Sequence, residues 1–150
     1  MKHFTFGLVL LSTLIFSCTQ KTENMSKTII STEKAPAAIG PYSQAVLAGH
    51  TLYCSGQIAI NPATGELDKS SIENETRQVM ANVGEVLKAA GMDYSNVVKA
   101  SIFMKDMNQY AAINGVYAEF FTQEPPAREA VEVARLPKDV NVEISVIAVR

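Results

Sequence analysis

Arg128 is the side chain whose setting in the sequence most clearly suggests chemistry. It follows Pro125-Pro126-Ala127 and precedes the apolar segment 130–134. The two prolines restrict the backbone just before it. A guanidinium on such a rigid support can hold a carboxylate through two parallel hydrogen bonds. The alternative, which composition favours, is an exposed arginine in a surface ion pair.

Glu143 is the candidate for a group that moves protons. It alternates with Val142 and Ile144 along an apolar segment, so in a strand it faces the opposite side from them. A carboxylate near a bound water can transfer protons during hydrolysis. The alternatives are an ordinary solvent-facing carboxylate or an ion pair with Arg135 or Lys138.

Several other catalytic arrangements are missing from the sequence. The two histidines are His3, near the N-terminus, and His50, in an expected turn. No His, Cys, Asp and Glu residues have metal-ligand spacing, and no phosphate loop or Ser-His-Asp set occurs, so we predict no metal and no cofactor. The groups that remain available for catalysis are arginine, carboxylate and tyrosine side chains, backbone groups and water. They suit hydrolysis of an amino-acid enamine or imine, because a positioned water can attack the electrophilic C=N carbon.

Two helices and several strands must position these side chains. Ser70 or Ser71 can cap the first helix, which ends at Gly91. The second begins after a cap within 106–108 and stops at Pro125. Their apolar side chains recur at helical spacing. In the first helix they are Ile72, Val79, Met80, Val83, Val86, Leu87 and Ala90, and in the second Tyr110, Ile113, Tyr117, Phe120 and Phe121.

The strand pattern predicts the fold class. The order of elements indicates an α+β fold, a mixed sheet with both helices packed on one face. The other face, which carries Ile147 and Val149, then needs a partner, and this predicts an oligomer. The strands are expected at 45–47, 51–55, 97–104, 130–134 and 142–149, with a hairpin turn at Ala48-Gly49-His50 between the first two.

Longer motifs follow one another along residues 27–150. They are Ala35-Pro36-Ala37-Ala38-Ile39-Gly40-Pro41-Tyr42-Ser43-Gln44, Ser55-Gly56-Gln57-Ile58, Asn61-Pro62-Ala63-Thr64-Gly65-Glu66, Val98-Lys99 through Phe103 to Asp106, Asn114 through Tyr117 to Phe120-Phe121, and the proline–arginine segment with Lys138-Asp139 and Glu143-Ile144 behind it. In this order they resemble the RidA/YjgF family of enamine/imine deaminases almost end to end.

The resemblance implies a fold, an assembly and an activity. The fold is a chorismate-mutase-like α+β subunit, and the assembly is a homotrimer with sites at the subunit interfaces. The activity is hydrolysis of small 2-aminoacrylate or 2-iminopropanoate-type acids to 2-oxo acids and ammonia, without a cofactor. Arg128 and Glu143 match the catalytic positions. The implied substrate-binding residues are Tyr42, Ser55, Gly56, Asn114 and Ala130.

The substrate-binding candidates have different expected roles. Tyr42 would line the pocket, although a half-buried tyrosine is the commoner fate of this residue type. Ser55 and Gly56 would bring backbone close to the ligand, since glycine permits a tight approach. Asn114 needs a hydrogen-bond partner, in a neighbouring subunit's pocket or in a loop that it holds. The backbone N–H of Ala130 can donate to the substrate carboxylate.

The chain departs from the family pattern just after Arg128. Ala130 stands where close relatives often have cysteine, so a thiol there is not essential. Glu129 stands where a small hydroxyl residue is common, and a carboxylate facing the pocket would repel an anionic substrate. The loop 122–124 is short, and we expect this to change the rim of the substrate pocket and thus the substrate side chains that it accepts.

Residues 1–17 are predicted to be a signal peptide. Lys2 and His3 precede an apolar run that is too short for a spanning helix, and Leu14-Ile15-Phe16-Ser17-Cys18 resembles a bacterial lipobox. We expect Cys18 to carry a lipid that anchors the protein in the cell envelope, on the periplasmic side. The alternative is an ordinary signal peptide with an incidental cysteine.

The rest of the chain suits one tethered domain. Residues 18–26 are predicted to be a flexible tether and 27–150 one domain, while Met25 offers a second start for a cytosolic form. The net charge of −2 indicates no nucleic-acid partner and no membrane contact besides the lipid. Cys54, in an apolar run, is predicted to be a small buried hydrophobe rather than a nucleophile.

Two functions from different classes follow from these observations. The first is the deaminase described above. The second is a trimer that binds 2-oxo acids without turnover or acts as a chaperone-like surface, because export would separate it from the pyridoxal-phosphate enzymes that make 2-aminoacrylate. RNA cleavage, a third function, finds little support in the charge of the chain.

Overall fold

The structure, a computed structural model, describes residues 26–150. The predictions for the signal peptide, for Cys18 as a lipid site, for the second start at Met25 and for most of the tether therefore lie outside the described residues. No helix within 26–150 is long and apolar enough to cross a membrane.

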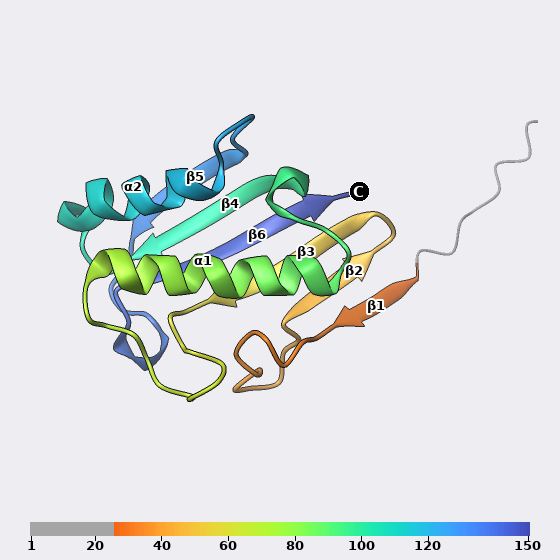
Figure 1. Ribbon diagram of the computed structural model, residues 1–150, viewed down its shortest axis with the longest axis horizontal. Coiled ribbons are helices and arrows are strands. Elements are labelled where there is room, and N and C mark those ends of the chain that lie inside the picture. Colours follow the sequence, from red (N-terminus) through yellow and green to blue (C-terminus); the bar gives the residue numbers. More distant parts are fainter. Residues whose placement is uncertain (1–25) are drawn as a thin grey trace, which may run out of the picture.

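The described residues form one six-stranded mixed sheet with two helices on one face (Figure 1). The strand order is β1-β2-β3-β6-β4-β5, in which only β4 and β5 pair in parallel. This confirms the predicted α+β fold. The strands are β1 (Lys27–Ile30), β2 (Ala45–Ala48), β3 (Thr51–Gln57), β4 (Val97–Met104), β5 (Ala127–Glu132) and β6 (Val142–Val149).

The helices begin largely as their caps predict. Ser71 caps α1 (Ile72–Ala89) by accepting from the backbone N–H of Asn74. Gly91 ends it with a φ of 71°, in the left-handed region that glycine adopts readily. Asp106 caps a short 3₁₀ helix that leads into α2 (Tyr110–Phe120). Residues 26–150 also contain three 3₁₀ helices, η1 (Tyr94–Asn96), η2 (Met107–Gln109) and η3 (Pro137–Asp139).

The sequence predictions missed one strand and misplaced several boundaries. Strand β1 was missed, because its four residues are mostly exposed and carry no clear alternation. Helix α2 ends at Phe120 rather than at Pro125. Strand β5 begins at Ala127, because its pairing with Lys99 of β4 starts there rather than at Ala130. Arg128 is therefore part of a strand instead of the turn before it.

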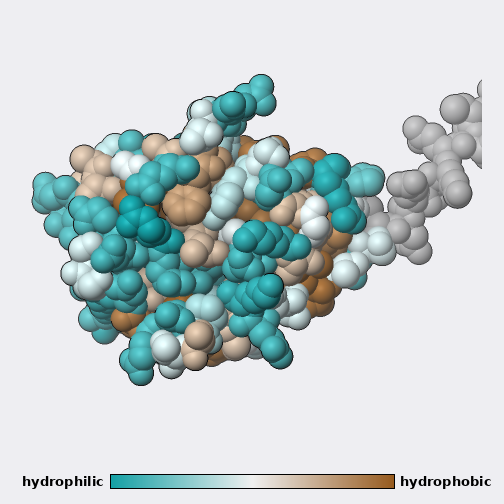
Figure 2. All heavy atoms as spheres, in the orientation of Figure 1, coloured by the Kyte–Doolittle hydropathy of each residue, from teal (hydrophilic) through white to brown (hydrophobic). Residues whose placement is uncertain are grey.

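The main core lies between the helices and the sheet. The predicted apolar stripe of α1 packs there against Val142, Ile144, Val146 and Ala148 of β6, all of which are buried. The outer surface of this layer is mainly hydrophilic along α1 (Figure 2). On the opposite face of the sheet, the buried residues Ile58, Ile60, Leu136 and Val140 pack with Phe103 in a second, smaller cluster. No helix covers the rest of this face within the described residues, and it exposes apolar side chains at Tyr53, Val131 and Val149.

Candidate functional site

The guanidinium of Arg128 is held by helix α2. Its Nη1 donates to Oδ1 of Asn114 at 2.5 Å, and its Nη2 donates to the hydroxyl of Tyr110 at 2.8 Å. The guanidinium carbon lies 5.0 Å from the centre of the Tyr117 ring, a cation–π distance. Residues 110, 114 and 117 are spaced i, i+4, i+7, so they share one face of α2. Asn114 therefore orients Arg128 within the chain.

Arg128 borders an open pocket of about 440 Å³. Among the described residues no carboxylate pairs with it, so the surface ion pair considered above is not formed. A guanidinium that is oriented by neutral groups keeps donor capacity for an anion. The pocket is lined by Asn114, Tyr117, Ala118, Phe121, Pro125, Pro126 and Arg128.

Glu143 borders a second pocket, of about 310 Å³. Its side chain is half-buried, and this burial raises the pKa of the carboxyl above its usual range. A carboxyl with a raised pKa is better suited to both accept and release a proton near neutral pH. The pocket is lined by Ile39, Tyr42, Ser55, Gly56, Ile58, Pro137 and Glu143.

Gly56 makes room for the Glu143 carboxylate. A Cβ on residue 56 would lie 2.7 Å from the carboxyl carbon of Glu143, well inside contact distance. The pairing of β3 with β6 is irregular between Cys54 and Gln57, and Gly56 lies in this irregular stretch. We predicted that Gly56 would let a ligand come close to the backbone. Within the chain, the group that lies close to the backbone of Gly56 is the Glu143 carboxyl.

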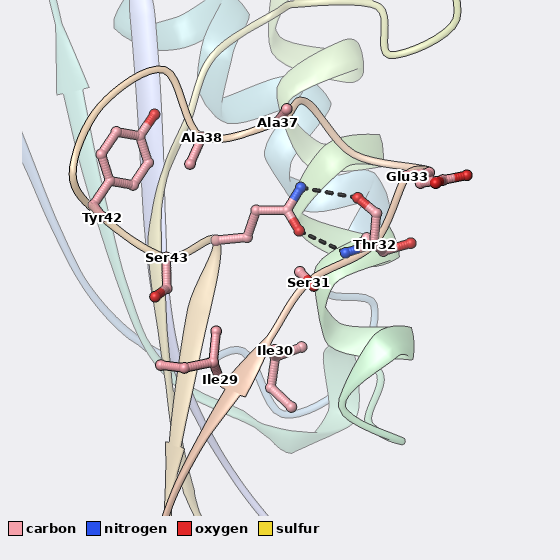
Figure 3. Close-up of a pocket in the computed structure, with 10 residues that line it drawn as sticks. Ile29, Ile30, Ser31, Thr32, Glu33, Ala37, Ala38, Tyr42 and Ser43 are labelled. Atoms are coloured by element: carbon pink, nitrogen blue, oxygen red, sulfur yellow. Dashed lines mark hydrogen bonds between the residues drawn. The ribbon is translucent and has the colours of Figure 1, made fainter.

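Ser55 and Gln44 hold the loop that carries Tyr42. The hydroxyl of Ser55 donates to the carbonyl of Ser43 at 2.7 Å. The buried Gln44 amide donates to the carbonyl of Thr32 and accepts from the Thr32 N–H (Figure 3). It also donates to the carbonyl of Pro36. Tyr42, which is 48% exposed, lies at the wall of the Glu143 pocket and also borders the hollow of about 430 Å³ drawn in Figure 3.

Arg128 and Glu143 project from opposite faces of the sheet. Arg128 pairs with the fully buried Ala100, so it points to the helix side. Glu143 pairs with Phe103 on the uncovered side. Within one chain the two side chains therefore border separate pockets. The structure brings Tyr42, Ser55, Gly56 and Glu143 together, and separately Asn114 and Arg128.

The two residues after Arg128 lie away from both pockets. Ala130 packs against the main core and lines neither the Arg128 pocket nor the Glu143 pocket. Glu129 points to the uncovered face, where it pairs with Lys99 and accepts a hydrogen bond from Ser101. These bonds lower the pKa of the Glu129 carboxyl. Glu129 therefore does not compete for Arg128 within the chain.

Sequence reasoning missed two side chains that contact the Arg128 guanidinium. Tyr110 and Tyr117 were assigned to an apolar helical stripe, yet both contact the guanidinium. Their spacing from Asn114 was the signal that could have identified them. Cys54 is buried, and this burial raises the pKa of its thiol to about 12, so it is an unreactive core residue. Residues 26–150 contain no group of three or more His, Cys, Asp or Glu that could hold a metal.

Comparison with known proteins shows extensive similarity. Residues 32–150 match the family model described as Endoribonuclease L-PSP. The chain is 53% identical to a RutC family protein of Pyrococcus horikoshii, covering 81% of this chain and 97% of that one. It is 51% identical to the 2-iminobutanoate/2-iminopropanoate deaminase of Capra hircus, covering 85% and 93%.

Solved structures agree with these sequence matches. The YjgF gene product of E. coli has 48% identity and a TM-score of 0.79, covering 82% of this chain and 98% of that chain. E. coli TdcF with bound serine has 44% identity and a TM-score of 0.79, with the same coverage.

Proposed function

Since this chain belongs to the RidA/YjgF family, we propose that it hydrolyses reactive 2-imino acids and their enamine tautomers to 2-oxo acids and ammonia. Relatives that are about 50% identical to this chain over most of their own length are named 2-iminobutanoate/2-iminopropanoate deaminases. The observation in the structure that carries the proposal is the Arg128 guanidinium, which neutral side chains orient and which no described carboxylate neutralises.

Arg128 anchors the substrate in this proposal. A 2-imino acid carries a carboxylate next to its C=N carbon, and the planar fork of a guanidinium matches a carboxylate. Asn114 and Tyr110 fix the orientation of the fork before the substrate arrives. The related E. coli TdcF has been solved with bound serine, another small acid with an α-carboxylate.

Glu143 moves protons in this proposal. Water adds to the C=N carbon while Glu143 accepts a proton from it and delivers one to nitrogen. The hydroxyl proton of the resulting carbinolamine then passes through Glu143 to nitrogen while the C–N bond breaks, so the C=O bond forms and ammonia leaves. Burial raises the pKa of the Glu143 carboxyl, which favours both directions of transfer.

The complete site is proposed to form between copies of the chain. In one chain Arg128 and Glu143 border separate pockets on opposite faces of the sheet. A homotrimer would let the Arg128 pocket of one subunit meet the Glu143 pocket of a neighbour. The uncovered sheet face, with its exposed Tyr53, Val131 and Val149, is a suitable surface for this contact.

The experiment couples an amino-acid lyase that generates 2-aminoacrylate to the purified protein. The decay of 2-aminoacrylate and the release of ammonia are followed with wild type, Arg128→Ala, Arg128→Lys and, as a matched control, Arg77→Ala. Arg77 makes an exposed ion pair with Glu119 and lies outside both pockets. Acceleration by wild type and Arg77→Ala alone supports the proposal. Full activity of Arg128→Ala, or 2-oxo acid binding without turnover by wild type, contradicts it.

The location of the protein is a separate proposal that rests on sequence alone. We propose that Cys18 carries a lipid and that the domain acts on the periplasmic side of a membrane. Cys18→Ser should move the protein from the membrane fraction to the supernatant of fractionated cells. N-terminal sequencing of both fractions tests the second start at Met25.

A further inference from the structure

The geometry points to Glu75 of α1 as a positioning residue for Glu143. Glu75 is fully buried, and both of its carboxylate oxygens bind one residue, Asn141. Oε1 accepts from the Asn141 backbone N–H at 2.7 Å, and Oε2 accepts from the Asn141 side-chain amide at 2.7 Å. Asn141 immediately precedes β6 and lies two residues before Glu143. This inference rests on the role proposed for Glu143.

Glu75 is unusual for a core residue, because it is a buried carboxylate without a cation beside it within residues 26–150. Burying a charge is unfavourable unless hydrogen bonds compensate for lost water, and no cation pairs with Glu75 among the described residues. Its place in the first turn of α1 is favourable for a negative charge. The two hydrogen bonds from Asn141 supply the remaining compensation for the water that the Glu75 carboxylate loses on burial. An apolar residue would fill the same space more simply, so the bonds themselves point to a role.

The segment that Glu75 holds is strained. Lys138 and Asp139 have φ values of 54° and 58°, two consecutive non-glycine residues in the left-handed region. Such backbone persists only where its surroundings hold it. Pro137 of the same turn lines the Glu143 pocket. Asn141 therefore joins a strained turn on one side of the pocket to the strand that carries Glu143.

Lys69 holds the turn that contains Lys138 and Asp139, whereas Asn141, at the start of β6, is held by Glu75 and by the residue that follows β4. Lys69 donates through Nζ to the carbonyl of Asp139 at 2.7 Å. The backbone N–H of Lys105 donates to the carbonyl of Asn141 at 3.0 Å. Glu75 alone takes the N–H of Asn141 and fixes its side chain from the helix layer. Without these bonds the start of β6 can shift, and Glu143 shifts with it.

The expected kinetic signature separates positioning from binding. Arg128, the proposed carboxylate anchor, lies on the other face of the sheet and in the other pocket. Loss of the Glu75 bonds should therefore misplace the proton-transfer group while substrate binding is retained. We expect kcat to fall and KM to change little.

Three variants test this. Glu75→Leu keeps a side chain of similar size but removes both bonds. Glu75→Gln can rebuild both, because its oxygen accepts the Asn141 N–H and a turned Asn141 amide accepts from its NH₂ group. Thr76→Val is the matched control, since Thr76 is equally buried on α1 but bonds only the carbonyl of Ile72 in its own helix.

Glu75→Leu should lower kcat at least about tenfold with KM within about threefold, whereas Glu75→Gln and Thr76→Val should stay within about twofold of wild type. Unchanged kcat in a folded Glu75→Leu protein overturns the inference. So does an equal loss in Thr76→Val, because that result would reflect general destabilisation.

A readout without catalysis keeps this test apart from that of the proposed function. Amide hydrogen exchange of the peptide 138–143 should be at least about tenfold faster in Glu75→Leu than in wild type, Glu75→Gln or Thr76→Val. Equal exchange in all four proteins overturns the inference. A wild-type protein that does not hydrolyse imines refutes the proposed function, while the exchange data still decide whether Glu75 holds Asn141.

Discussion

The carboxyl group of Glu143 packs directly against the backbone of Gly56. A Cβ on residue 56 would lie 2.7 Å from the carboxyl carbon and 2.9 Å from Cγ of Glu143. Two strands distant in sequence, β3 and β6, thus share one tight contact at the wall of a pocket. The absence of a side chain at residue 56 decides where the carboxylate of Glu143 can lie.

Gly56→Ala should therefore inactivate the enzyme without unfolding it. The added methyl group forces Glu143 out of its position, and we expect kcat for imine hydrolysis to fall at least about tenfold. Gly115→Ala is the control, because a Cβ at that helical glycine meets no atom within 4 Å. Gly115→Ala should keep full activity and gain up to about 1 kcal/mol of stability. Full activity of Gly56→Ala would contradict the proposed role of Glu143.

Asn114→Asp should be more damaging than Asn114→Ala. The alanine variant leaves Arg128 with one acceptor, Tyr110, so the guanidinium is less well oriented and kcat/KM should fall roughly tenfold. The aspartate variant adds a carboxylate that pairs with Arg128 and competes with the substrate carboxylate. Steady-state kinetics of the two variants give the comparison. An aspartate variant that is the more active of the two would show that Arg128 does not bind an anion.

The aromatic ring of Tyr117, rather than its hydroxyl, should contribute to kcat/KM. The ring lies under the Arg128 guanidinium at 5.0 Å, while the buried hydroxyl has no hydrogen-bond partner among the described residues. Tyr117→Phe should keep kcat/KM and retain or gain stability, because it removes an unsatisfied polar group. Tyr117→Leu should lower kcat/KM several-fold, since the cation–π contact contributes about 1 kcal/mol. Equal activity of the two variants would exclude a role for the ring.

Glu143→Gln should stabilise the protein at neutral pH while abolishing turnover. Burial raises the pKa of the Glu143 carboxyl, so the folded state binds this proton more tightly than the unfolded state does. The stabilisation from this group is present below the unfolded pKa and is lost as pH rises through the raised folded pKa.

Thermal unfolding at two pH values measures this effect. The Tm of Glu143→Gln should exceed that of wild type at pH 8, and the difference should shrink at pH 4, as the wild-type carboxyl gains its proton. Wild-type kcat should fall on the acid side as Glu143 gains its proton. A Tm difference that grows toward acid pH would contradict the raised pKa.

Cys54 should resist alkylation in the folded protein. Burial excludes reagent and raises the pKa of the thiol to about 12, so little thiolate exists near neutral pH. In a Cys18→Ser background, mass spectrometry should find Cys54 unmodified by iodoacetamide in native buffer and modified in urea. Rapid modification of the native protein would show that the strand β3 opens readily.

Elements with a strong local pattern were predictable. The segments 97–104 and 142–149 became β4 and β6 with the expected bounds, because β-branched and alternating side chains define a half-buried strand within a few residues. Ser71 and Gly91 bounded α1 because capping is also local. Strand β1 was missed, since its formation depends on pairing with β2, and its own residues carry little pattern.

The sequence by itself determined the α+β class, the residue types available for chemistry and, through ordered motifs, the family that the chain belongs to. Only the tertiary structure decided how these residues meet. Which face of β5 carries Arg128 depends on its parallel register with β4, and the place of Glu143 depends on the central position of β6 between β3 and β4. Strand order and register are set by contacts between distant segments, and no local periodicity encodes them.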